Sequence, residues 1–257
     1  MINPIKEVLR QQKDMKMKGN LYHVSQVKFA YNSNHIEGSK LSEEQTELIF
    51  QTNTVMLDNQ NESINVDDVI ETRNHFILFD YLIDHADDPL TTDLIKEYHR
   101  ILKVNTADSQ KKWFMVGDWK RLPNVVGDME TTAPDKVDIE INKLLENYNK
   151  LEEVSFEDIV DFHVKFEKIH PFQDGNGRVG RAIIFKECLK NNIVPFIVLD
   201  EQKAFYYRGL KEYSKEKGFL METCRHFQDY YNDIYERLVG NYLDEFLEIP
   251  SDEQEIN

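Results

Sequence analysis

The segment from residue 170 to residue 181 combines side chains and backbone freedom suited to phosphate chemistry. It reads HPFQDGNGRVGR. Gly175 and Gly177 allow backbone conformations that side chains forbid, and they lead directly into an expected helix. The free N–H groups and the dipole at a helix N-terminus favour an anion. Arg178 and Arg181 are three residues apart, so they are neighbours on the first turns of that helix. Two guanidinium groups above such a nest of N–H groups predict a polyphosphate site.

Two further residues of this segment extend the prediction to chemistry at phosphorus. Asp174 offers a hard oxygen ligand, which Mg²⁺ on a nucleotide requires. His170 follows the preceding helix, and its ordinary pKa of about 6.5 suits a general base for an attacking hydroxyl. Each residue alone has a plainer interpretation, with His170 or Asp174 as a helix cap and Arg181 as a surface cation. Phe172 is expected to anchor the loop in the core. The combination favours the functional interpretation.

The same segment resembles the signature of the Fic family, HPFx(D/E)GNGRxxR, at every specified position. The resemblance covers about residues 20–215. It implies an all-α fold, a helical bundle with a short β-hairpin flap over the active site. It also implies that ATP and Mg²⁺ are bound and that AMP is transferred to a Ser, Thr or Tyr hydroxyl of a target protein.

The resemblance assigns roles to individual residues. His170 is the catalytic base that takes the proton of the target hydroxyl, Asp174 holds Mg²⁺, and Arg181 meets the γ-phosphate. A hairpin at about 121–130 is similar to the flap, whose backbone would align the target by strand addition. Tyr207 or its neighbour resembles the position that packs near adenine. The residues expected to bind the nucleotide are Gly175, Asn176, Gly177, Arg178, Val179, Gly180, Arg181 and Tyr207.

A second resemblance lies near the N-terminus. The run SNHIEG, from Ser33 to Gly38, resembles the inhibitory motif (S/T)xxxE(G/N) of Fic proteins that carry an inhibitory helix ahead of the core. The plainer interpretation is a helix end with Gly38 at the C′ position. In the functional interpretation, the carboxylate of Glu37 competes with the γ-phosphate for Arg181. ATP then binds misaligned for as long as the two residues are paired.

Helical periodicity dominates the chain, and Pro and Gly are scarce. Ser42 with Gln45, and Ser155 with Asp158, predict helix starts. In the long helix at 66–86 we expect one core face, made of Val69, Ile70, Phe76, Ile77, Tyr81 and Leu82. The expected helices are 4–18, 21–36, 42–55, 66–86, 91–102, 135–150, 155–169, one from about 176, 200–216 and 219–239.

The expected organisation follows from these elements. Residues 1–60 form an N-terminal helical region with the inhibitory helix at about 21–37, and residues 61–217 form the Fic core. Residues 218–250 form a C-terminal helical extension, and the acidic tail 251–257 is expected to fray.

Three other functions compete with AMP transfer. Gly175-x-Gly177-x-x-Gly180, with Asp200 after it, has the spacing of a dinucleotide-binding fingerprint and would imply an NAD-dependent oxidoreductase. That fingerprint needs a strand before the glycines, where the periodicity is helical. A Fic-like fold could also serve as a binding module, although His170 and both arginines are intact. Related chemistries on the fold include removal of AMP and transfer of phosphate or phosphocholine.

Composition restricts the partners. The 257 residues carry a formal net charge of −16, and so acidic a surface argues against nucleic-acid binding. No apolar run is long enough for a membrane span, and the N-terminus does not resemble a secretory signal. The two cysteines, Cys188 and Cys224, favour reduced thiols in a cytoplasmic protein. A homodimer is expected from the habit of related proteins and from aromatic residues in 219–246.

Overall fold

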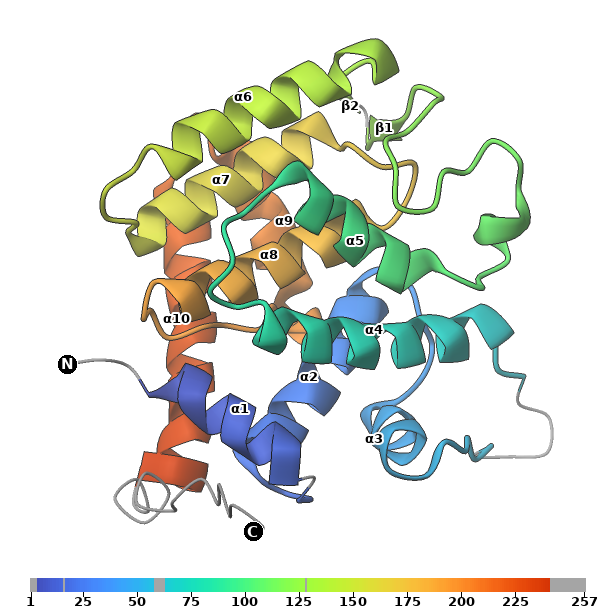
Figure 1. The fold of residues 1–257 in the computed structure, drawn as a ribbon, viewed down its shortest axis with the longest axis vertical. Coiled ribbons are helices and arrows are strands. Elements are labelled where there is room, and N and C mark those ends of the chain that lie inside the picture. The colour runs from blue at the N-terminus through green and yellow to red at the C-terminus, as the bar shows by residue number, and fades with distance from the viewer. Residues whose placement is uncertain (1–3, 16, 58–62, 128, 241–257) are drawn as a thin grey trace, which may run out of the picture.

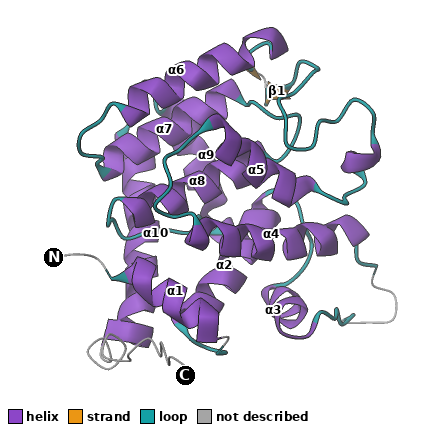
Figure 2. Ribbon diagram, in the orientation of Figure 1, coloured by secondary structure: helices purple, strands orange, loops and turns teal. Residues whose placement is uncertain are grey.

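The protein is almost entirely helical in a computed structural model, which describes residues 4–15, 17–57, 63–127 and 129–240 (Figures 1 and 2). The α-helices are α1 (Ile5–Met15), α2 (Leu21–Ile36), α3 (Glu43–Thr52), α4 (Val66–Asp84), α5 (Thr92–Lys103), α6 (Val137–Asn149), α7 (Phe156–Ile169), α8 (Asn176–Lys190), α9 (Lys203–Glu212) and α10 (Gly218–Tyr235). Short elements are the 3₁₀ turns η1 (Asp108–Gln110), η2 (Pro134–Lys136) and η3 (Asp200–Gln202), the π-helical turn η4 (Glu236–Gly240), and the strands β1 (Val125–Val126) and β2 (Met129–Glu130). The expectation of an all-α fold with one hairpin is confirmed.

Local capping signals set several helix starts. Ser42 and Gln45 form a reciprocal capping box before α3, and Ser155 forms another with Asp158 before α7. Thr91 caps α5 at the expected start, because its side chain accepts the N–H of Leu94. These starts confirm the predictions, since a cap depends on only three or four consecutive residues.

Other boundaries differ from the prediction. Helix α3 ends at Thr52 because Asn53 adopts the left-handed conformation, and α4 ends at Asp84. The helix expected at 200–216 is a 3₁₀ turn followed by α9. The tail at 251–257 lies outside the described residues.

The predicted core face of α4 is partly wrong. Ile77 is 55% exposed, while Leu78, Phe79 and Ile83 are fully buried. Helix α4 contacts α2, α3, α5 and α8, so several neighbours cover it at once. A helix that is covered from several sides does not display a single apolar stripe, and a one-sided pattern misassigns part of it.

Helix α8 lies near the centre of the molecule, between α7 and α6 at the top of Figure 1 and α4 and α1 below. It contacts α7, α5, α4, α2 and α1. Nearly all of its residues are buried, including both arginines of the motif. The segment that carries the candidate chemistry therefore begins a helix whose position is fixed by most of the fold.

Helix α2 is also buried along most of its length, although it precedes the expected core. It packs against α1, α3, α4, α8 and η3. Its end has the Schellman pattern, with the N–H of Ser39 donating to Asn34 and Gly38 at a φ of +103°. Among the described helices, none has the length and apolar character needed to cross a membrane.

Candidate active site

The motif loop connects the end of α7 with the start of α8 through fixed backbone contacts. His170 ends α7 in the left-handed conformation, and Gly175 takes a φ of +81° immediately before α8. Asn176 closes the loop, because its side chain accepts the N–H of Phe172 at 2.8 Å and donates to the carbonyl of the same residue at 2.9 Å. Proline at position 171 keeps the chain from continuing as a helix. The loop thus holds its shape without a ligand.

His99 of α5 packs against the motif loop and supports it. Its ring stacks on Phe172, with centroids 4.0 Å apart and planes 4° from parallel. Its Nδ1 accepts the N–H of Gly117 at 2.9 Å, and its Nε2 lies 3.2 Å from the carbonyl oxygen of Asp174. Burial, with a smaller effect of Lys103, lowers the pKa of His99 to about 3. The ring is therefore neutral and bonded on both sides, as a fixed support must be.

Asp174 is held in a network of buried charges. Its Oδ2 accepts bonds from Lys103 Nζ at 2.7 Å and from Arg178 at 3.1 Å. Glu71 of α4 binds the same two cations, at 2.5 Å from Lys103 Nζ and through a short bond to Arg178. Burial opposes the charge of Asp174, but Arg178 and Lys103 outweigh it and hold its pKa well below the usual range. Asp174 is thus an ionised carboxylate at neutral pH.

This arrangement fits a Mg²⁺ ion that arrives with a nucleotide. Both protein cations bind Oδ2, and about half of the Asp174 side chain is exposed, so the other oxygen can serve as a ligand. Within the described parts of the chain, no group of three or more His, Cys, Asp or Glu residues could hold a metal ion. Phosphate oxygens and water would have to complete the shell, which is how Mg²⁺ is usually bound beside nucleotides.

Arg181 is bound by the end of α2 on the other side of the loop. Its Nε donates to the hydroxyl of Ser33 at 3.0 Å, and one terminal nitrogen donates to the carbonyl of Ser33 at 2.9 Å and to Glu37 at 2.7 Å. Burial opposes the positive charge, but Glu37 keeps the pKa of Arg181 above its usual value. The structure therefore brings Ser33, Glu37 and Arg181 together.

The carboxylate of Glu37 also lies against the first turn of α8. A Cβ atom at Gly177 would come within 2.3 Å of its Oε1, so only glycine leaves room for it there. No side chain caps the first N–H groups of α8 in the described structure. An anion thus already stands at the N-terminal end of α8, beside Arg181, where the sequence predicts a phosphate.

The other expected nucleotide residues divide into accessible and buried ones. Gly177 is accessible, whereas Val179 is completely buried and packs in the core. Gly180 faces α7, because a Cβ there would lie 2.6 Å from Glu167 Oε1. Tyr207 is 46% exposed, while Tyr206 is buried and bonded to His163. Of the tyrosine pair, Tyr207 is the one that a ligand can reach.

His170 lies at the edge of this cluster, with 19% of its side chain exposed. Its Nδ1 is 3.9 Å from Glu167 Oε2. Burial, and then the charge of Lys120, lower the pKa of His170 to about 4. The imidazole is therefore neutral at physiological pH and able to accept a proton.

The predicted hairpin lies beside His170 and is anchored to the motif loop. Val125 pairs with Glu130 and Val126 with Met129 in an antiparallel ladder. The N–H of Lys120 donates to the carbonyl of Pro171, and its ammonium group bonds Asn124 and Thr131 at the base of the hairpin. Val125 and Val126 are exposed. The hairpin thus presents a short free strand edge near the candidate base.

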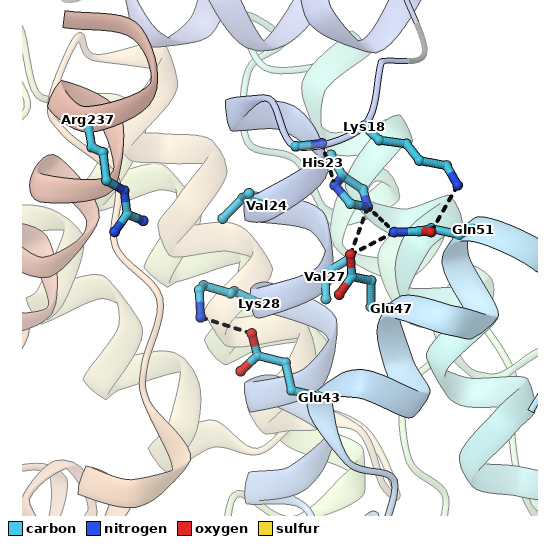
Figure 3. A pocket seen from close by; sticks show the side chains of 10 residues that line it. Lys18, His23, Val24, Val27, Lys28, Glu43, Glu47, Gln51 and Arg237 are labelled. Carbon is cyan, nitrogen blue, oxygen red and sulfur yellow. Dashed lines mark hydrogen bonds and ion pairs between the residues drawn. The ribbon is translucent and has the colours of Figure 1, made fainter. Parts of the chain in front are cut away.

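A separate cavity of about 510 Å³ lies between α2, α3 and η4 (Figure 3). Lys28 pairs with Glu43 at 2.9 Å across it, and Lys18 bonds Gln51 at 2.9 Å. None of the residues that line it belongs to the motif loop. These contacts connect α2 to α3, so the cavity belongs to the support of α2 rather than to the candidate site.

Several residues of the site were not predicted from the sequence. Glu71 and Lys103 come from α4 and α5, and Lys120 comes from the segment before the hairpin. Only the spacing of His163, Glu167 and His170, three or four residues apart on one helix, was a usable signal. The others meet the motif through tertiary packing, which no local pattern records.

The dinucleotide alternative is excluded by the element that precedes the glycines. Residues 156–169 form α7, a helix, and no strand leads into Gly175. The apolar run at 193–199 is mostly buried and forms no strand. The βαβ unit that the fingerprint requires is therefore not present in the described structure.

Comparisons with known proteins agree with the motif. Residues 89–187 match the model of the Fic/DOC family. The chain is 25% identical over 219 residues to protein adenylyltransferase fic-1 of Caenorhabditis elegans. The aligned region covers 82% of this chain and 41% of that protein. It is 24% identical over 224 residues to protein adenylyltransferase Fic of Aedes aegypti, with 84% and 42% covered. The chain thus spans less than half the length of these curated relatives.

Solved structures share the fold over nearly the whole chain. A Fic domain containing signaling protein from Bacteroides thetaiotaomicron superposes with a TM-score of 0.67 at 25% identity, covering 95% of this chain and 92% of that one. A Fic family protein from Desulfovibrio desulfuricans has a TM-score of 0.68 at 19% identity, covering 91% and 72%, which bears on the fold alone. The matched region contains the whole motif from His170 to Arg181. Residues 89–187, which carry the motif, thus match the Fic/DOC family, and the chain shares the fold of Fic-domain proteins.

Proposed function

We propose that this protein is an adenylyltransferase that moves AMP from ATP onto Ser, Thr or Tyr hydroxyls of target proteins and of itself. The observation that carries the proposal is the convergence of His170, Asp174, Arg178 and Arg181 around the start of α8. The names of the curated relatives support the same activity.

The proposed reaction assigns one task to each group. The target hydroxyl attacks the α-phosphorus of ATP, the bond to the bridging oxygen breaks, and pyrophosphate leaves with its electron pair. His170 takes the hydroxyl proton, since its imidazole is neutral. Arg178 and the N–H groups of the first turn of α8 bind the phosphates, and Arg181 binds the γ-phosphate. Mg²⁺ held by Asp174 would neutralise phosphate charge.

We further propose that Glu37 inhibits this reaction from within the chain. Its carboxylate is 2.7 Å from Arg181 and lies against Gly177, so it competes directly with the γ-phosphate. Because α2 is packed on several helices, the competitor is held in place without any loss of translational freedom. ATP must displace Glu37 before its γ-phosphate can dock, and it is misaligned until then.

The partners follow from the same geometry. The exposed edge at Val125 and Val126 is suited to pair with an extended segment of the target, which would align the hydroxyl with His170. We propose a cytoplasmic setting, because Cys188 and Cys224 are buried and unbonded, as thiols in a reducing compartment are.

The deciding experiment compares AMP incorporation from labelled ATP by the parent protein and by Glu37→Gly. The variant should incorporate AMP at least about 10-fold faster, because a competitor worth about 1.5–3 kcal/mol is removed from Arg181. Adding His170→Ala to Glu37→Gly should abolish transfer, since loss of a general base costs about 100- to 10,000-fold.

A matched control is Glu153→Gly, which removes an exposed glutamate from the loop before α7. It should leave the rate at the parent level. Equal rates in the parent and Glu37→Gly proteins would exclude the inhibitory role of Glu37. No transfer by either protein, with any target or onto itself, would exclude the adenylyltransferase assignment.

A further inference from the structure

Glu167 lies one turn before His170 on the same face of α7. Its Oε2 is 3.9 Å from His170 Nδ1, and only 16% of its side chain is exposed. Its Oε1 has no hydrogen-bond partner among the described residues. His170 Nδ1 also lacks a side-chain partner there, although the backbone of Glu167 raises the pKa of this ring. Buried polar groups normally form hydrogen bonds. Two buried polar atoms that lack a side-chain partner, on two neighbouring side chains, therefore require an explanation.

The surrounding chain leaves space for this carboxylate. Gly180 of α8 faces it, and a Cβ at that position would come 2.6 Å from Glu167 Oε1. His163, one turn earlier on α7, contacts the same glycine and bonds Tyr206 on its other side. Gly180 therefore has a task in the packing of α7 on α8, which explains a glycine within a buried helix.

We propose that Glu167 is a positioning residue for His170, whose Nδ1–H it accepts so that Nε2 is left free to take the proton of the target hydroxyl. A rotation of the glutamate side chain would be needed to shorten the 3.9 Å separation between Glu167 Oε2 and His170 Nδ1 to a hydrogen bond. The carboxylate then fixes the tautomer of the imidazole and stabilises the imidazolium formed in the reaction, as carboxylates do in other His-dependent enzymes. This inference rests on the proposed function of the same site.

The charges around the pair set its pH dependence. Burial raises the pKa of Glu167 to about 7, with Arg181 of α8 acting against the shift and Glu37 of α2 adding to it. The groups that face Glu167 or His170 are Arg181, Glu37, Tyr206, Tyr207, His163, Lys120 and Asp174. Because the ionised carboxylate is the better acceptor, transfer should fall as pH drops through about 7.

The kinetic test places Glu167→Gln in the Glu37→Gly background. We expect kcat to fall about 10- to 100-fold, with KM for ATP unchanged, because the residue acts on the base and not on the nucleotide. The acid limb of kcat/KM near pH 7 should disappear in this variant. Glu167→Asp keeps the charge and should retain the limb at an intermediate rate.

The matched control is Glu157→Gln, which changes an exposed glutamate in the first turn of the same helix. It should leave kcat and the pH profile unchanged. A glutamate with only a packing role would change the melting temperature and leave the acid limb in place. An unaltered rate and pH profile in Glu167→Gln would therefore overturn the proposal.

A second measurement does not depend on activity. Nitrogen-15 spectra of the histidines, assigned for His170 by comparison with His170→Ala, report which ring nitrogen carries the proton. We expect Nδ1–H in the Glu37→Gly protein, and a protonated Nε2 would overturn the proposal. If Glu37→Gly transfers no AMP at all, the proposed function fails, while the tautomer still decides the positioning role.

Discussion

Three buried cations surround the start of α8, and each is bound by a carboxylate of the same chain. Lys103 and Arg178 share Glu71 and Asp174, and Arg181 holds Glu37. A buried charge without a partner is strongly destabilising, so the site needs these carboxylates when ATP is absent. In the proposed function, ATP would therefore exchange the ion pair of Arg181 with Glu37 for one with phosphate instead of filling an empty basic pocket.

At the scale of single residues, we expect that replacing Asp174 weakens Mg²⁺ binding and leaves nucleotide binding in place. In the Glu37→Gly background, Asp174→Asn should reduce Mg²⁺-dependent AMP transfer at least about 100-fold, because a neutral amide is a much weaker Mg²⁺ ligand than a carboxylate. Calorimetric titration with ATP should show that Mg²⁺ no longer strengthens binding, while binding of free ATP persists.

The control for this change is Asp108→Asn, a second carboxylate near Lys103 at 3.5 Å but outside the motif loop. It should keep Mg²⁺-dependent transfer. Full activity of Asp174→Asn would instead show that the metal is held by other groups.

Among the elements, the contact between α2 and α8 is the one on which the proposed inhibition depends. It includes the two bonds from Arg181 to Ser33, and it includes Glu37, which lies against Gly177 while bound to Arg181. Helix α2 is supported by bonds at its end, where His35 pairs with Asp200 of η3 at 2.8 Å. The carboxylate that we propose to be inhibitory is thus placed by a docked helix rather than by a free tail.

This contact predicts coupling between residues 37 and 177. In the parent, Gly177→Ala should lower the melting temperature and weaken inhibition, because the new Cβ would lie 2.3 Å from Glu37 Oε1. The free energy of unfolding should fall by about 1.5–3 kcal/mol if the charged hydrogen bond between Glu37 and Arg181 is broken. In the Glu37→Gly background the same substitution should cost less, because only the approach of the new Cβ to the Arg181 guanidinium, at 2.8 Å, remains. Calorimetry of the four proteins without nucleotide measures the difference, and additive effects would contradict the contact.

How much the sequence predicts differs between elements and site. Helix starts at Ser42 and Ser155 were predictable, since a capping box lies within four consecutive residues. The pairing of Glu37 with Arg181 was predictable from residue type and spacing, while the roles of these residues stay predictions. The partnership of Glu71 with Lys103 was not, because 32 residues separate them and only the packing of α4 on α5 brings them together. The exposed side of α4 was misassigned for the same reason.

For the whole molecule, the buried histidines predict a fall in stability toward acid pH. Burial lowers the pKa of His75, His99 and His163 to about 3 and that of His170 to about 4. In the unfolded chain, histidines titrate at about 6.5, so the unfolded state binds more protons between about pH 3 and 6.5. Stability is therefore present above this window and is lost as pH falls through it. Glu167 and Asp80, whose pKa values are raised by burial, act in the opposite direction.

Urea unfolding at about pH 7.5 and about pH 5 measures this fall, at up to about 1.4 kcal/mol per pH unit for each group. His75→Leu should reduce the pH dependence, because this ring is fully buried and has no hydrogen-bond partner within the described chain. The control is His226→Gln, which changes an exposed histidine and should leave the pH dependence of stability unchanged. Equal free energies of unfolding at the two pH values would contradict the argument.

The expected homodimer stays a prediction, and part of its basis is lost. The aromatic residues Phe227, Tyr231 and Tyr235 of α10 are buried within their own chain, so they offer no surface to a second copy. Residues 241–246, which contributed to that expectation, lie outside the described residues. Light scattering at working concentrations measures whether the protein is a monomer or a dimer. Either result leaves the proposed catalytic roles unchanged.

His170 occupies a left-handed position at the end of a helix, where glycine is the usual residue. It ends α7 with a φ of 51° and a ψ of 63°, a conformation that costs most side chains about 1–2 kcal/mol and glycine almost nothing. Replacing the histidine with glycine would relieve this strain and would also release an imidazole from burial. A library screened for heat resistance alone should therefore enrich glycine at this position and yield robust proteins that have lost their chemistry. Thermostability is a misleading guide to improvement in this scaffold, and any engineering of it has to select for turnover at the same time.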